Sequence, residues 1–64
     1  MIKVVYWLGT TQREELVSGY DEALEIASRN KNTSLPRFYD DDNTQLYDDG
    51  NGLFAEDDEG IYRY

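Results

Sequence analysis

Cysteine and histidine are both absent from this 64-residue chain. Without cysteine there is no disulfide framework and no thiolate nucleophile, and without either residue the usual zinc sites are excluded. The lack of cysteine also fits a reducing, intracellular setting. No apolar run approaches the roughly 20 residues of a membrane-spanning helix, and the apolar residues 2–8 are too few for a signal peptide. We therefore expect a soluble, cytoplasmic protein with no membrane partner.

Length and charge leave two broad classes open. A chain of this size forms at most one domain, residues 1–64, and buries only about 60% of the surface that its unfolded form exposes. Low hydrophobicity with a high net charge, here −8, is typical of disordered chains. One tryptophan, six tyrosines, two phenylalanines and two well-patterned apolar segments favour a folded domain instead.

Basic residues are scarce in the second part of the chain. Residues 1–37 hold five acidic and five basic residues and are neutral, whereas residues 38–64 hold nine acidic residues and only Arg63 as a base. The whole net charge therefore lies beyond residue 37. Such a field repels nucleic acid and anionic lipid. We therefore expect a basic protein as partner, and no direct contact with nucleic acid.

The first part predicts strands and one helix. IKVVYWL (2–8) is rich in β-branched and aromatic residues, and its almost continuous apolar run is typical of a central strand covered on at least one face. Residues 20–30 carry apolar residues at helical spacing, with Ser18 as the predicted N-cap and acidic Asp21 and Glu22 in the first turn, where the helix dipole favours them. The predicted core members of this part are Val4, Tyr6, Leu8, Leu24 and Ala27.

Two interpretations of residues 11–19 stay open. In the first, Gly9-Thr10-Thr11 forms a turn and residues 13–19 form a strand that pairs back as a hairpin. In the second, Thr11 and Glu14 form a capping box and residues 11–30 form one helix. That helix would contain Gly19 in its interior, at a cost of about 1 kcal/mol relative to alanine, so we prefer the hairpin.

After Pro36 the sequence becomes repetitive. FYDDDNTQ (38–45) and LYDDGNGL (46–53) align at a spacing of eight residues, and FAEDDEGI (54–61) follows them more loosely. Each unit opens with bulky apolar residues and closes in Asp, Asn or Gly, which suit tight turns. We predict strands near 37–40, 44–48, 52–56 and 60–64. The predicted fold class is α+β: an N-terminal strand or hairpin, one helix and a C-terminal acidic antiparallel β-meander.

The acidic residues fall at the predicted strand ends and turns. Alternate residues of a strand lie about 6.7 Å apart and neighbouring strands about 4.8 Å, so rows of carboxylates can imitate phosphates, of which duplex DNA shows one per about 1.7 Å. A protein that holds phosphates with Lys and Arg could bind such rows, and tyrosines would add contact area with a polar tip. The predicted partner-binding residues are Asp40, Asp41, Asp42, Asp48, Asp49, Glu56, Asp57, Asp58, Glu59, Tyr39 and Tyr47.

Other interpretations of the acidic segment remain. The acids could be solvated turns that keep a small structural or assembly protein soluble, with the tyrosines packed in the core or sheet. Oxygen-rich turns also suit weak calcium binding, at Asp40–Asp42 or Asp57–Glu59. The EF-hand pattern itself fails: with Gly52 at the loop glycine, Tyr47 takes the first ligand position, where Asp is required. We expect neither a cofactor nor catalysis, because nothing separates the pKa values of two carboxylates and no His or Cys assists them.

In size, charge and residues 38–60, the chain resembles the small, acidic, cysteine-poor proteins that bacteriophages make to block host enzymes. That class includes DNA mimics and small inhibitors of bacterial RNA polymerase. DEALEIA (21–27) is similar to the helix of one such polymerase-inhibitor family, and LYDDGNGL is similar to the tyrosine-aspartate repeats of large bacterial β-shell proteins. The first resemblance implies stoichiometric inhibition through an acidic surface, without chemistry, in the host cytoplasm. It assigns no role to an individual residue.

Overall fold

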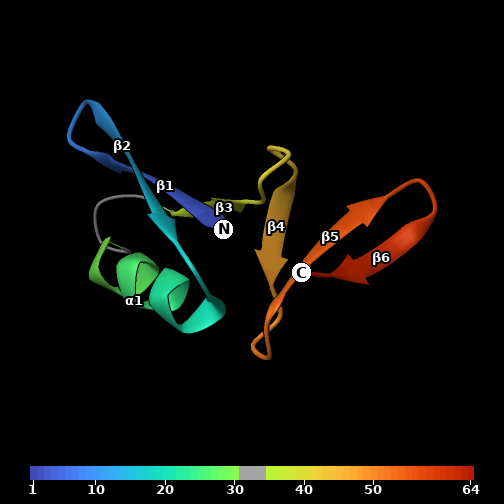
Figure 1. The fold of residues 1–64 in the computed structure, drawn as a ribbon. Helices are drawn as coiled ribbons and strands as arrows, with labels where there is room; N and C mark the ends of the chain where they lie inside the picture. The colour runs from blue at the N-terminus through green and yellow to red at the C-terminus, as the bar shows by residue number, and fades with distance from the viewer. Residues whose placement is uncertain (31–34) are drawn as a thin grey trace.

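An antiparallel sheet backed by a helix on one face forms the fold (Figure 1). The computed structural model describes residues 1–30 and 35–64. Over these residues its elements are β1 (Ile2–Leu8), β2 (Thr11–Val17), α1 (Tyr20–Asn30), β3 (Arg37–Tyr39), β4 (Gln45–Asp48), β5 (Leu53–Asp57) and β6 (Gly60–Arg63). The strand order is β2-β1-β3-β4-β5-β6, and every neighbouring pair is antiparallel. The predicted α+β class is confirmed.

Residues 11–17 form a strand, so the preferred hairpin is correct and the single long helix is wrong. β1 and β2 pair along their whole length, from Ile2 opposite Val17 to Leu8 opposite Thr11. The two-residue turn between them needs a positive φ, which Gly9 supplies at 63°. The strand begins two residues earlier than predicted because the turn closes directly after Gly9 and Thr10.

The N-cap of the helix is Gly19, one residue later than the predicted Ser18. The carbonyl of Gly19, not that of Ser18, accepts the first helical hydrogen bond, from the Ala23 N–H at 3.1 Å. The Glu22 carboxylate folds back over this glycine, so that Glu22 Oε2 lies 2.9 Å from where a Cβ of residue 19 would be. The acidic residues Asp21 and Glu22 lie in the first turn as expected, in favourable interaction with the helix dipole.

Both halves of the chain contribute to the core. Its buried residues are Ile2, Val4, Tyr6, Ala23, Ile26, Phe38, Leu46, Leu53 and Ala55, with Val17, Tyr20 and Ala27 packed against them. The prediction that Val4 and Tyr6 belong to the core is confirmed, and Leu24 is only half-buried. The prediction that Leu8 belongs to the core is wrong. Leu8 lies at the turn end of β1 and is 42% exposed.

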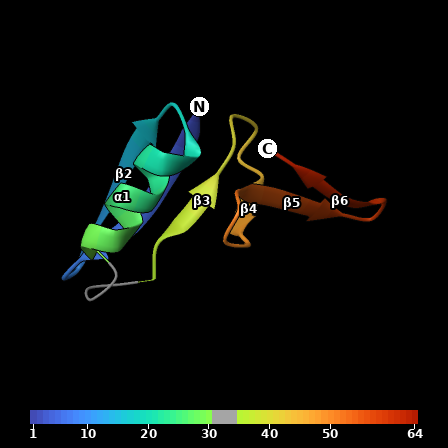
Figure 2. The ribbon, with the colours of Figure 1, turned by 90° about the horizontal axis from the view of Figure 1, so that it is seen from below.

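Four core residues, Phe38, Leu46, Leu53 and Ala55, come from the acidic second part. The predicted meander is confirmed, with strand ends displaced by at most one residue from the prediction. The acidic sequence is therefore part of the packed fold. Seen from below, α1 lies over β1 and β2, whereas the hairpin of β5 and β6 extends to the far side (Figure 2). The described residues accordingly form an elongated body of 37 × 20 × 18 Å.

Candidate partner-binding surface

The carboxylates of the turn between β3 and β4 have two different roles. Asp40 Oδ1 accepts the backbone N–H groups of Asp42 and Thr44, both at 2.9 Å. This is the local bonding by which Asp favours turns. Asn43 completes the turn at a positive φ of 66°. Asp40 thus holds the turn, whereas Asp41 and Asp42 are exposed. The Asp41 carboxylate also lies 2.9 Å from the amino group of Met1 and raises the pKa of that group.

Both predicted acids of the turn between β4 and β5 are engaged within the protein. Asp48 Oδ1 accepts the backbone N–H of Gly50 at 2.8 Å and the hydroxyl of Tyr20 at 2.6 Å. The hydrogen bond to Asp48 raises the pKa of Tyr20 to about 12, because ionised tyrosine could not donate it. This contact ties the meander to the first turn of α1, 28 residues earlier in the chain.

Asp49 ties the same turn to the last strand. Its Oδ2 accepts from Arg63 Nη1 at 2.5 Å and its Oδ1 from Arg63 Nη2 at 3.2 Å. The backbone N–H of Asn51 donates to Oδ1 at 2.9 Å. The Arg63 guanidinium, followed by this backbone N–H, lowers the pKa of Asp49 to about 2. The pair engages Arg63, the base of residues 38–64, although the Arg63 side chain is still 53% exposed.

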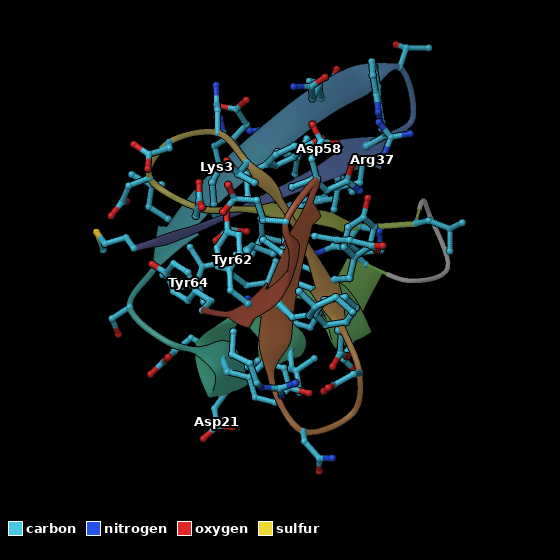
Figure 3. The ribbon with its side chains drawn as sticks, turned by 90° about the vertical axis from the view of Figure 1, so that its right-hand side faces the viewer. Lys3, Asp21, Arg37, Asp58, Tyr62 and Tyr64 are labelled. Carbon is cyan, nitrogen blue, oxygen red and sulfur yellow. The ribbon has the colours of Figure 1, made fainter. Side chains whose placement is uncertain are left out.

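The turn between β5 and β6 presents acids at the tip of the projecting hairpin. It consists of Asp58 and Glu59, which are exposed, as is Glu56 on β5. The side chain of Asp57 lies outside the described part of the structure. Successive turns of a meander lie at alternate ends, so this tip is at the same end as the β3–β4 turn and the Asp48–Asp49 turn is at the other. In Figure 3, Asp58 and Asp21 mark these two opposite ends.

Six of the nine predicted carboxylates therefore fall into two groups, whereas Asp40 holds its own turn, Glu56 is exposed on β5 and the Asp57 side chain lies outside the described part. At one end Asp41, Asp42, Asp58 and Glu59 are exposed. At the other, Asp48 and Asp49 serve Tyr20 and Arg63, and Asp21 of α1 adds negative charge nearby, since it too acts to raise the pKa of Tyr20. The exposed set is the part of the prediction most accessible to a partner, although Asp41 is also paired with the amino group of Met1.

The two predicted tyrosines lie on the face of the sheet away from α1. Tyr39 is half-buried, with Lys3 Nζ 5.5 Å from its ring centre. Tyr47 is 44% exposed and packs on Phe54, with ring centres 5.6 Å apart. Both are therefore packed in the sheet, as the alternative interpretation had it, while part of Tyr47 remains available.

The basic residues on the face of the sheet away from α1, called the open face below, were not predicted from the sequence. Lys3, Val5 and Trp7 alternate with the buried residues of β1, and with Arg37 they line a hollow of about 480 Å³ over β1, β2 and β3. The apolar run of residues 2–8 concealed this alternation. A strict count of alternate positions would have placed Lys3 and Trp7 together on the face opposite Val4.

Among the described side chains, no group of three or more carboxylates lies close enough to hold a metal ion. No helix in residues 1–30 or 35–64 is long and apolar enough to cross a membrane. No protein-family model, curated protein or solved structure matches the chain.

Proposed function

We propose that the protein is a non-catalytic interaction module that presents exposed carboxylates to a basic protein. One observation carries this proposal: the acidic turns belong to strands that bury Phe38, Leu46, Leu53 and Ala55 in the core. The exposed acids of two turns at the same end are therefore presented from a fixed scaffold. A fixed array of like charge steers and orients a partner of opposite charge, because little ordering is needed on binding.

The proposed partner is a protein that binds nucleic acid through Lys and Arg. Carboxylates can replace phosphates on such a surface, since both accept charge-assisted hydrogen bonds from guanidinium and ammonium groups. Binding would then exclude the nucleic acid, which makes the module a stoichiometric inhibitor, as the phage proteins that it resembles are. Under this proposal it acts in the cytoplasm, the host cytoplasm if it is phage-encoded.

The test is capture of partners from a bacterial lysate on the immobilised chain, followed by competition. The proposal requires that duplex DNA displaces the retained protein and that binding weakens steeply with added salt. The informative variant neutralises the exposed acids of one end, with Asp41→Asn, Asp42→Asn, Asp58→Asn and Glu59→Gln combined. We expect it to weaken binding roughly tenfold, from four lost surface charge pairs.

The control variant carries Asp21→Asn, Glu22→Gln and Glu25→Gln on the exposed side of α1, together with Ser28→Lys, so that its net charge changes by the same amount. Circular dichroism verifies that both variants fold. If the two variants weaken binding equally, net charge alone is responsible and the proposed surface is wrong. Binding that neither salt nor DNA alters would favour the solubility interpretation of the acids.

A further inference from the structure

The face of the sheet away from α1 gathers most of the large exposed apolar side chains. Trp7 is 46% exposed, Leu16 65%, Leu35 87%, Tyr47 44% and Ile61 65%. The register places Trp7, Leu16, Tyr47 and Ile61 on this face, and Leu35 lines its hollow. A sheet face with this composition is normally covered. The helix of the described chain covers the other face, which is where the buried residues of β1 point.

Charge on the open face differs from charge on the rest of the protein. Lys3 and Arg37 lie on the side of the sheet opposite α1 (Figure 3). Glu14 of β2 shares the hollow with them. This small area is therefore slightly cationic, while the acids of the meander lie in its turns. Asn43 of the β3–β4 turn also lines the hollow, so that acidic turn borders the contact between two such faces.

The strand register makes the face complementary to itself. Val5 of β1 pairs with Glu14 on β2 and with Arg37 on β3, so these three side chains form one row with opposite charges at its two ends. A half-turn about an axis along β1 reverses that row. Glu14 of one copy then lies over Arg37 of a second copy, and Arg37 over Glu14. The same rotation places Val5 on Val5 and Trp7 on Trp7. It also brings the two Lys3 side chains together, where each Nζ is turned aside to donate to Asn43 Oδ1 at 2.7 Å.

We propose that this open face binds a second copy of the chain, forming a two-fold symmetric dimer of facing sheets. The strands of facing sheets cross at about 30° because each sheet is twisted. The crossing displaces Glu14 from the Arg37 of the second copy, and both side chains are long enough to bridge that displacement. Such an isologous contact closes on itself. The proposal does not depend on the proposed function, because it uses the face and not the exposed acids of the turns.

The dimer is expected to be weak. β1 and β2, with seven residues each, and β3, with three, offer a face of at most roughly 14 × 23 Å per copy. This face is smaller than the roughly 800 Å² per partner of a standard stable interface. The charge of −8 on each copy opposes association further. The dissociation constant therefore belongs in the micromolar to millimolar range, and it is expected to improve when salt screens the long-range repulsion.

Sedimentation equilibrium over a series of protein concentrations at physiological salt measures the association. The mass must rise from monomer to dimer and no further. Trp7 is the single tryptophan of the chain, so its emission must shift to shorter wavelength, and its quenching by acrylamide must fall, over the same concentrations. A chain that stays monomeric up to millimolar concentration, or a mass that climbs beyond the dimer, would overturn the proposal.

Charge reversal identifies the face. Glu14→Arg and Arg37→Glu each place like charges over one another, and each is expected to weaken dimerisation roughly tenfold or more. Their combination exchanges the charges within each pair and restores the association to within about threefold of the original. The matched controls are Glu25→Arg and Arg29→Glu on the exposed side of α1, which change net charge equally. If single reversals act no differently from these controls, or the combined variant fails to recover, the face is not the interface.

Discussion

Truncation of Leu46 to alanine tests whether the acidic half of the chain is held by the core. Leu46 is 2% exposed and lies on β4, between the helix-backed strands and the projecting hairpin. Removing a buried leucine side chain costs about 3–5 kcal/mol. At 0.05–0.15 kcal/mol per residue, a chain of this length has a free energy of unfolding of about 3–10 kcal/mol. The variant therefore loses about half of the stability, or unfolds outright.

Leu35→Ala is the matched control, because the same side chain is shortened where it is 87% exposed. Its free energy of unfolding should change by less than about 0.5 kcal/mol. Urea unfolding, followed by circular dichroism and Trp7 fluorescence in dilute solution, measures both. With a slope near 1 kcal/mol/M for a small protein, the Leu46 variant should unfold about 3 M earlier. Equal midpoints for the two variants would show that the meander is not packed as described.

Three other predictions concern the turn between β4 and β5. Asp49 has its pKa lowered from 3.8 to about 2 by Arg63, so the stabilisation of the fold by this ion pair is present above about pH 4 and lost as pH falls toward 2. The melting temperature of Asp49→Asn should therefore fall less between pH 4 and 2 than that of the original chain. Tyr20 has its pKa raised from 10.0 to about 12 by Asp48, so the stabilisation from this hydrogen bond is complete below pH 10 and lost between pH 10 and 12. Tyr20→Phe should therefore be less stable at neutral pH, and its melting temperature should change less with pH between pH 10 and 12. Gly50 has a φ of 92° with open space around it, so Gly50→Ala should cost about 1–2 kcal/mol in urea unfolding through backbone strain alone. A native-like melting profile for any of these variants would contradict the contact or conformation assigned to it.

Much of the fold could be predicted because its signals are local. Apolar residues at each repeat start and Asp, Asn or Gly at each end specify the short strands and tight turns of the meander within a few residues. Apolar residues at helical spacing with Asp21 and Glu22 at the start likewise located α1. The N-cap was missed because Ser18 is the better side-chain cap by residue type, whereas the carbonyl of Gly19 accepts the first helical hydrogen bond.

The division of the carboxylates into internal and exposed groups could not be predicted in the same way. Asp40 uses its own turn, which is a local property, but Asp48 and Asp49 find Tyr20 and Arg63 at separations of 28 and 14 residues. Nothing in the adjacent sequence distinguishes Asp49 from Asp41. Similarly, the open face depends on which side of β1 the helix covers, and that is decided by the packing of Ala23 and Ile26.

Because β4 is short, it connects the helix-backed strands and the terminal hairpin through few residue pairs. β4 shares two residue pairs with β3 and two with β5, whereas β1 and β2 share seven. Few ladder hydrogen bonds therefore cross the molecule at this strand, and local opening is easiest where such bonds are few. Separation there would release the terminal hairpin as a unit and leave the helix-backed strands paired, so hydrogen exchange should show lower protection in β6 than in β1.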